Sequence, residues 1–83
     1  MIINARDVIE SYISKHRIPK VEFARKAKIT YQFLWLILKK HKNIGANTAL
    51  AIEKATNGEI KKEWLVFPQE YRKEIEEYLK KGA

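Results

Sequence analysis

The chain lacks cysteine altogether and contains only three glycines and two prolines. Without cysteine it can form neither disulfide bonds nor thiolate metal sites. Because a β-sandwich needs turn residues about every 8–12 positions, the scarcity of glycine and proline argues against one. The longest apolar run, residues 33–38, is far shorter than the roughly 18 residues that cross a bilayer. The first residues show no signal-peptide pattern, so we expect a cytoplasmic protein with no membrane partner.

The size of the chain also limits what it can do. Its 83 residues are enough for one domain, and a hydrophobic content of 46 % supplies a core. A core of this size leaves no room for a deep substrate pocket and a cofactor domain. We therefore expect neither a cofactor nor a small-molecule substrate.

Positive charge is concentrated in one segment. Lys and Arg outnumber Asp and Glu by 17 to 10, a net charge of +7. Residues 15–42 hold nine of the basic residues and one acidic residue, Glu22, whereas the remainder holds eight basic and nine acidic residues. A localised basic surface is typical of proteins that bind a polyanion. The alternative is a solvated lysine-rich surface of the kind that thermophilic proteins also carry.

Apolar residues recur at helical spacing along most of the chain, which predicts an all-α protein, a compact bundle of five or six short helices. The first helix spans residues 4–16 with Asn4 as its N-cap, and the second spans residues 19–28 with Pro19 in its first turn. The third spans residues 31–40 with Thr30 as its N-cap.

The second half of the chain continues the helical pattern. Asn47 or Thr48 is the predicted N-cap of a fourth helix, which ends at Asn57 and Gly58. Residues 60–66 are either one helical turn or an extended piece. A last helix spans residues 69–81, and its apolar stripe packs on the core or forms a dimer contact; the stripe consists of Tyr71, Ile75, Tyr78 and Leu79.

The second and third predicted helices form a helix-turn-helix pattern, two short helices joined by a tight turn and flanked by basic residues. Ala24 is small enough for the two helices to cross closely. Apolar residues hold the pair together: Phe23, Ala27, Ile29, Leu34 and Ile37. The outward face of the third helix then carries Tyr31, Gln32, Trp35, Leu36 and Lys39.

Residues 23–37 resemble the helix-turn-helix of the Cro and phage-repressor family in their spacing of small, turn and core residues. Residues 49–60, which read ALAIEKATNGEI, are similar to the following helix in the YdaS-like Cro subgroup. The resemblance implies a lambda-repressor-like DNA-binding domain over residues 1–66, with residues 67–83 as a C-terminal helix. It also implies a transcriptional regulator, a repressor encoded by a phage or prophage, that binds nucleoid DNA as a homodimer on near-palindromic sites.

In such a protein the helix over residues 31–40 enters the major groove of double-stranded DNA. The resemblance then implies base contacts from Tyr31, Gln32, Trp35 and Lys39. It implies contacts to the DNA backbone from Lys20, Arg25, Lys26, Lys28, Thr30, Lys40, Lys42 and Asn43. Gln32 can pair with N6 and N7 of adenine, and Lys39 can reach guanine or a phosphate.

Two positions depart from the family pattern. The family usually has glycine in the turn, where the backbone is left-handed, and here Lys28 stands in its place. A residue other than glycine costs about 1 kcal/mol in that conformation, so we expect a slightly opened turn. The family usually carries polar residues where this chain has Trp35 and Leu36. These side chains can contact thymine methyl groups, and they can equally pack in the core or against another protein.

A second interpretation is a helix-turn-helix scaffold that binds protein instead of DNA, such as an antitoxin or a phage accessory protein. An enzyme is not expected, because the chain has no glycine-rich phosphate loop and no paired carboxylates on one helix face. Its two histidines, His16 and His41, have no Asp, Glu or Cys at ligand spacing, so we expect no metal site.

Overall fold

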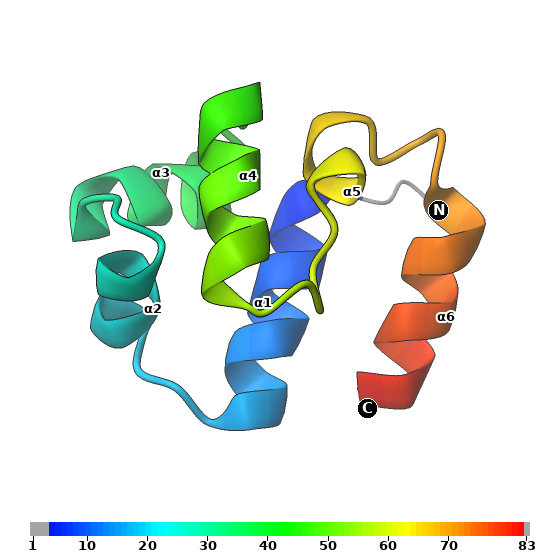
Figure 1. The fold of residues 1–83 in the computed structure, drawn as a ribbon, viewed down its shortest axis with the longest axis horizontal. Helices are drawn as coiled ribbons and strands as arrows, with labels where there is room; N and C mark the ends of the chain where they lie inside the picture. Colours follow the sequence, from blue (N-terminus) through cyan, green and yellow to red (C-terminus); the bar gives the residue numbers. More distant parts are fainter. Residues whose placement is uncertain (1–3, 83) are drawn as a thin grey trace.

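The computed structural model describes residues 4–82. Within them the chain forms six helices and no strand (Figure 1), which confirms the all-α prediction. The helices are α1 (Ala5–His16), α2 (Lys20–Lys26), α3 (Tyr31–Lys40), α4 (Ala46–Ala55), α5 (Lys62–Val66) and α6 (Arg72–Gly82).

Side chains and backbone together set where the helices begin. At α1 the backbone N–H of Asn4 donates to Oδ2 of Asp7 at 3.1 Å. At α3 the Oγ1 of Thr30 accepts from the backbone N–H of Phe33 at 3.0 Å. The predicted N-caps Asn4 and Thr30 are therefore confirmed.

Four predicted helix boundaries are wrong, and one of them is the end of α2, which lies at Lys26 and not at Lys28. Helix α4 begins after Gly45 and not after Asn47 or Thr48, because the N–H of Ala49 already bonds to the Gly45 carbonyl at 2.9 Å. Pro19 lies in the N-cap position of α2 and not in its first turn. Helix α6 begins at Arg72 because residues 68–71 form turns.

Four helices end at a residue with left-handed backbone that is not glycine. These residues are Arg17, Lys28, His41 and Asn57, with φ between 53° and 59°. The predicted end of α4 at Asn57 and Gly58 is confirmed, since Gly58 also has a positive φ of 82°. Glycine or asparagine suits this position, so the other three residues adopt it against their intrinsic preference.

Helix α1 lies at the centre of the fold and packs against α3, α5 and α6 (Figure 1). Its residues Val8 and Ile9 are fully buried. The largest other fully buried side chains come from five further parts of the chain and complete one continuous core: Phe23, Leu34, Ile37, Leu38, Ile52, Ile60 and Ile75.

Helix α6 packs on α1, on the side away from α2 and α3 (Figure 1). Ile75 is fully buried, and Tyr71, Tyr78 and Leu79 lie partly buried against the same core. Glu59, in the segment between α4 and α5, links the ends of α1 and α6. Its carboxylate accepts hydrogen bonds from Lys15 Nζ at 3.1 Å, from His16 Nε2 at 2.9 Å and from Tyr78 Oη at 2.7 Å.

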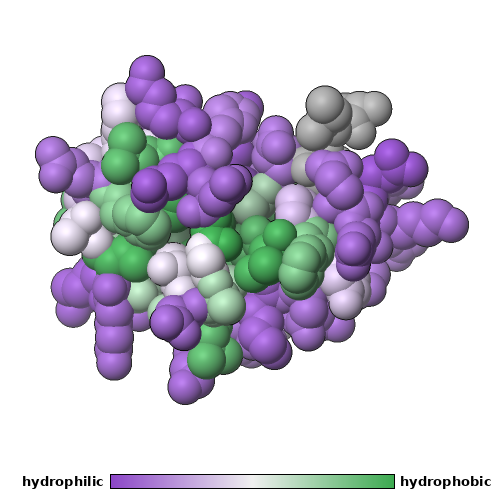
Figure 2. All heavy atoms as spheres, turned by 90° about the horizontal axis from the view of Figure 1, so that it is seen from above, coloured by the Kyte–Doolittle hydropathy of each residue, from purple (hydrophilic) through white to green (hydrophobic). Residues whose placement is uncertain are grey.

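Apolar side chains reach the surface in patches that hydrophilic residues surround (Figure 2). Among residues 4–82, the large hydrophobic residues that stay exposed are Val21, Tyr31, Trp35, Leu50 and Phe67. In the part of the chain that the structure describes, every helix is too short or too polar to cross a bilayer.

Candidate functional site

The candidate site is built on α2, α3 and the turn between them, residues 27–30. The N–H of Lys28 donates to the Arg25 carbonyl at 3.1 Å, and the N–H of Ile29 donates to the Ala24 carbonyl at 3.0 Å. These two bonds make the Schellman arrangement that ends a helix on a left-handed residue. Lys28 is that residue, with φ of 59°. The turn is fully closed, so the expectation that Lys28 opens it is wrong.

Buried apolar residues hold α3 against α2 and the rest of the fold. Phe23, Ala24 and Ala27 are 0–2 % exposed on the α2 side, and Leu34 and Ile37 are equally buried beneath α3. Because large-to-small changes at such positions cost several kcal/mol, the orientation of α3 is strongly determined. Its inner face is filled by its own apolar residues, which leaves the opposite face outward.

The outer face of α3 carries the residues predicted to contact bases. Gln32 and Lys39 are exposed, and Tyr31 and Trp35 are 47 % and 42 % exposed. Trp35 therefore does not lie in the core, which leaves base contact or protein contact as its alternatives. Leu36 is half-buried at one side of this face.

The lysines predicted to contact DNA have no carboxylate partner within residues 4–82. Lys39, predicted to contact a base, and the five lysines predicted to contact the DNA backbone are all exposed, and none forms an ion pair there; the five are Lys20, Lys26, Lys28, Lys40 and Lys42. Elsewhere three basic residues pair with glutamates at 3.6–3.7 Å; they are Lys61 just before α5, Lys62 on α5 and Arg72 on α6. The excess positive charge is therefore not neutralised around α2 and α3.

Arg25 differs from these lysines because it pairs with Glu22, three residues earlier in α2. The hydrogen bond from Arg25 lowers the pKa of the Glu22 carboxyl, and the same bond raises the pKa of Arg25. A phosphate would have to compete with Glu22 for this guanidinium. Arg25 remains exposed but is the weakest of the predicted backbone contacts.

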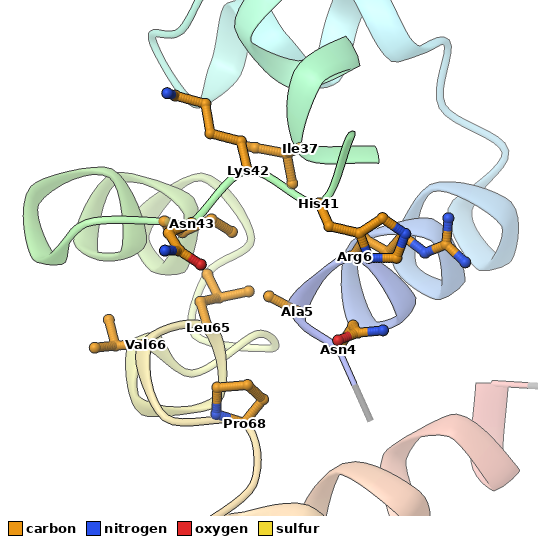
Figure 3. A pocket seen from close by; sticks show the side chains of 11 residues that line it. Asn4, Ala5, Arg6, Ile37, His41, Lys42, Asn43, Leu65, Val66 and Pro68 are labelled. Carbon is orange, nitrogen blue, oxygen red and sulfur yellow. The ribbon is translucent and has the colours of Figure 1, made fainter. Parts of the chain in front are cut away.

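Thr30 and Asn43 lie at the two ends of α3. The oxygen of Thr30 is occupied as the N-cap acceptor, while its hydroxyl hydrogen remains able to donate to a phosphate. Asn43 is exposed in the loop after α3. Together with His41 and Lys42 it borders a pocket of about 150 Å³ between that loop, the start of α1 and α5 (Figure 3).

Two basic residues near this surface were missed by sequence reasoning. Arg6 borders the pocket of Figure 3, and its Nη1 donates to the Leu38 carbonyl at 3.1 Å, which ties the last turn of α3 to α1. Lys54 of α4 lies beside Lys26 and Lys28 around a hollow of about 360 Å³. Both lie outside residues 15–42, so neither contributes to the charge excess that a count along the chain detects.

Comparison with known proteins leaves the assignment open. No protein-family model matches the chain, and no curated protein or solved structure does so significantly. The resemblance to the Cro and phage-repressor family therefore stays a prediction.

Proposed function

We propose that this protein is a sequence-specific DNA-binding regulator in which α2 and α3 act as a helix-turn-helix and α3 enters the major groove. The supporting observation is the combination on α3 of a buried inner face with an outer face of Tyr31, Gln32, Trp35 and Lys39. Exposed lysines that have no carboxylate partner within residues 4–82 flank this face. The major groove of DNA is wide enough to admit an α-helix.

Each group has a distinct chemical task in this proposal. The amide of Gln32 donates to N7 and accepts from N6 of adenine, and Lys39 donates to guanine or a phosphate. The lysines of α2 and the turn hold one DNA strand, and those at the end of α3 hold the other. The protein acts by occupying its site on nucleoid DNA in the cytoplasm, as a homodimer on a near-palindromic sequence and without a cofactor.

Salt dependence tests the proposal directly. Each phosphate neutralised lowers the slope of log K against log salt concentration by about 0.9, so contacts from six lysines predict a slope of about −5 per subunit. We expect binding to a random duplex to weaken steeply between low and moderate salt, and a selected duplex to bind more tightly at every salt concentration. The mass of the complex in solution gives its stoichiometry.

Matched lysine variants locate the binding surface. Lys26→Ala and Lys39→Ala should each reduce the magnitude of the slope by about 0.9. Lys73→Ala removes another exposed lysine from α6, on the far side of the fold (Figure 1), and should leave the slope unchanged. Equal slopes for all three variants would contradict the proposed surface.

The exposure of Val21 and Trp35 favours one alternative, a scaffold that binds another protein through the same face. Val21 is 63 % exposed on α2, the helix that packs against α3. Large exposed apolar residues commonly mark protein contacts. Failure of the protein to bind any duplex at low salt would favour this alternative over the DNA-binding regulator.

A further inference from the structure

The outer face of α3 contains very few polar groups for a surface that reads bases. At about 100° per residue, Tyr31 and Trp35 lie along one edge of this face and Leu36 along the other. Gln32 and Lys39 project between them. The amide of Gln32 and the ammonium group of Lys39 can therefore hydrogen-bond to bases. Trp35 and Leu36 offer mainly apolar surface, and Tyr31 offers a ring with a single hydroxyl.

Trp35 is the least expected of these residues. It is 42 % exposed, whereas Trp64, the other tryptophan, is 6 % exposed and packs 5.4 Å from the ring of Tyr78. Trp35 lies one turn after Tyr31, so the two aromatic side chains are neighbours on the helix surface. No hydrogen-bond partner for the Trp35 indole occurs within residues 4–82.

The bases differ in how well they accept such a surface. In the major groove the C5-methyl group of thymine is the one apolar group, whereas a G·C pair presents only donors and acceptors. An apolar ring placed over a G·C pair would remove water from these polar groups without replacing their hydrogen bonds, which is unfavourable. Over an A·T pair the ring contacts the methyl group, while Gln32 can satisfy the adenine.

We propose that α3 recognises thymine through its methyl group, with Trp35 as the main contact, and that the preferred half-site is rich in A·T pairs. This inference rests on the proposed function and adds the class of base that the helix reads. Gln32 supplies hydrogen bonds to adenine, and Trp35 supplies the discrimination against G·C pairs and against bases without a methyl group.

Deoxyuridine provides the test, because it differs from thymidine only by the missing methyl group. The probes are an alternating A·T duplex and the same duplex with every thymidine replaced by deoxyuridine, so that any register presents methyl groups to the helix. Burial of one methyl group contributes about 0.8 kcal/mol, which corresponds to a fourfold change in affinity. We expect the uracil duplex to bind at least fourfold more weakly at the same salt concentration.

Two variants show whether Trp35 is responsible. Trp35→Ala should bind the thymine and uracil duplexes with equal affinity, while Lys26→Ala should weaken both equally and keep their ratio. Trp35 lies on the exposed face, and the buried Trp64 remains as a fluorescent reporter of folding in this variant.

The outcomes separate this inference from the proposed function. Equal, salt-dependent binding of both duplexes by the unmodified protein would overturn methyl recognition and leave DNA binding intact. A preference for thymine that persists in Trp35→Ala would overturn the role of Trp35. Absence of salt-dependent binding to either duplex would overturn both proposals.

Discussion

Replacement of Lys28 by glycine should make the protein more stable and bind DNA less tightly. The backbone of Lys28 is left-handed, with φ of 59°, a conformation that costs an L-residue about 1–2 kcal/mol. Glycine adopts it freely but loses about 0.5–1 kcal/mol through its greater freedom in the unfolded chain. The two bonds that close the turn come from backbone N–H groups and are kept. The Lys28 side chain is exposed and forms no ion pair within residues 4–82, so its loss removes no partner.

The net effect on folding is a gain of about 0.5–1 kcal/mol, which raises the melting temperature by roughly 2–8 °C in a domain of this size. Circular dichroism during thermal and urea unfolding measures it. Arg17→Gly relieves the same backbone conformation, with φ of 53° at the end of α1, and should give a gain of similar size. A Lys28→Gly protein that is no more stable than the unmodified one would refute the strain assigned to this turn.

The effect on binding is separate and can be isolated with a second variant. Lys28→Met removes the charge and keeps the left-handed backbone, so its stability should be unchanged while its salt slope falls by about 0.9. Lys28→Gly should show the same fall in slope despite its greater stability. A full slope in both variants would exclude a phosphate contact from Lys28.

Two further predictions concern the packing of α6 and the Glu59 contacts. Ile75→Ala should lower the free energy of unfolding by about 2–5 kcal/mol, because Ile75 of α6 is fully buried and α6 packs on α1. A loss below about 1 kcal/mol, measured by urea unfolding, would show that α6 contributes little to the core. Burial acts to raise the pKa of the Glu59 carboxyl, but its hydrogen bonds from Tyr78, Lys15 and His16 outweigh burial and lower the pKa below 4.5. A lowered pKa in the folded state means that this stability is present above the unfolded pKa and is lost as the pH falls through the folded value. Glu59→Gln should therefore be about 1–2 kcal/mol less stable than the unmodified protein at pH 7, and it should lose less stability on acidification. Glu77→Gln serves as an exposed control. Equal stability of the two variants at pH 7 would contradict this role of Glu59.

The helices were largely predictable because their signals are local. At the N-cap of α1 the backbone N–H of Asn4 donates to the carboxylate of Asp7, and at the N-cap of α3 the hydroxyl of Thr30 accepts from the N–H of Phe33. Both partners lie three residues further along the chain. The end of α4 at Asn57 and Gly58 uses residues that tolerate left-handed backbone. The start of α4 was missed because Gly45 acts through backbone geometry alone, with no side-chain hydrogen bond at the cap. A sequence offers Asn47 and Thr48 as better caps, and nothing local excludes them.

The candidate site was predictable in position and less so in detail. The charge excess over residues 15–42 pointed to α2 and α3, and the lysines named from it are exposed. Glu22 and Arg25 lie three residues apart, a spacing that is visible in the sequence. The spacing alone does not predict the pair, because water competes for both side chains when an ion pair is exposed. Arg6 and Lys54 approach the site only through contacts between distant segments.

Composition and periodicity by themselves determined that this chain is helical, which residues share a helix face, and where its positive charge is concentrated. Only the tertiary structure decided which of those faces meet another helix. The two tryptophans illustrate the difference, since Trp64 is covered by α6 and Trp35 stays exposed, which neither local sequence pattern decides. Helical spacing depends on neighbours three or four residues apart, whereas burial depends on packing between segments far apart in the chain.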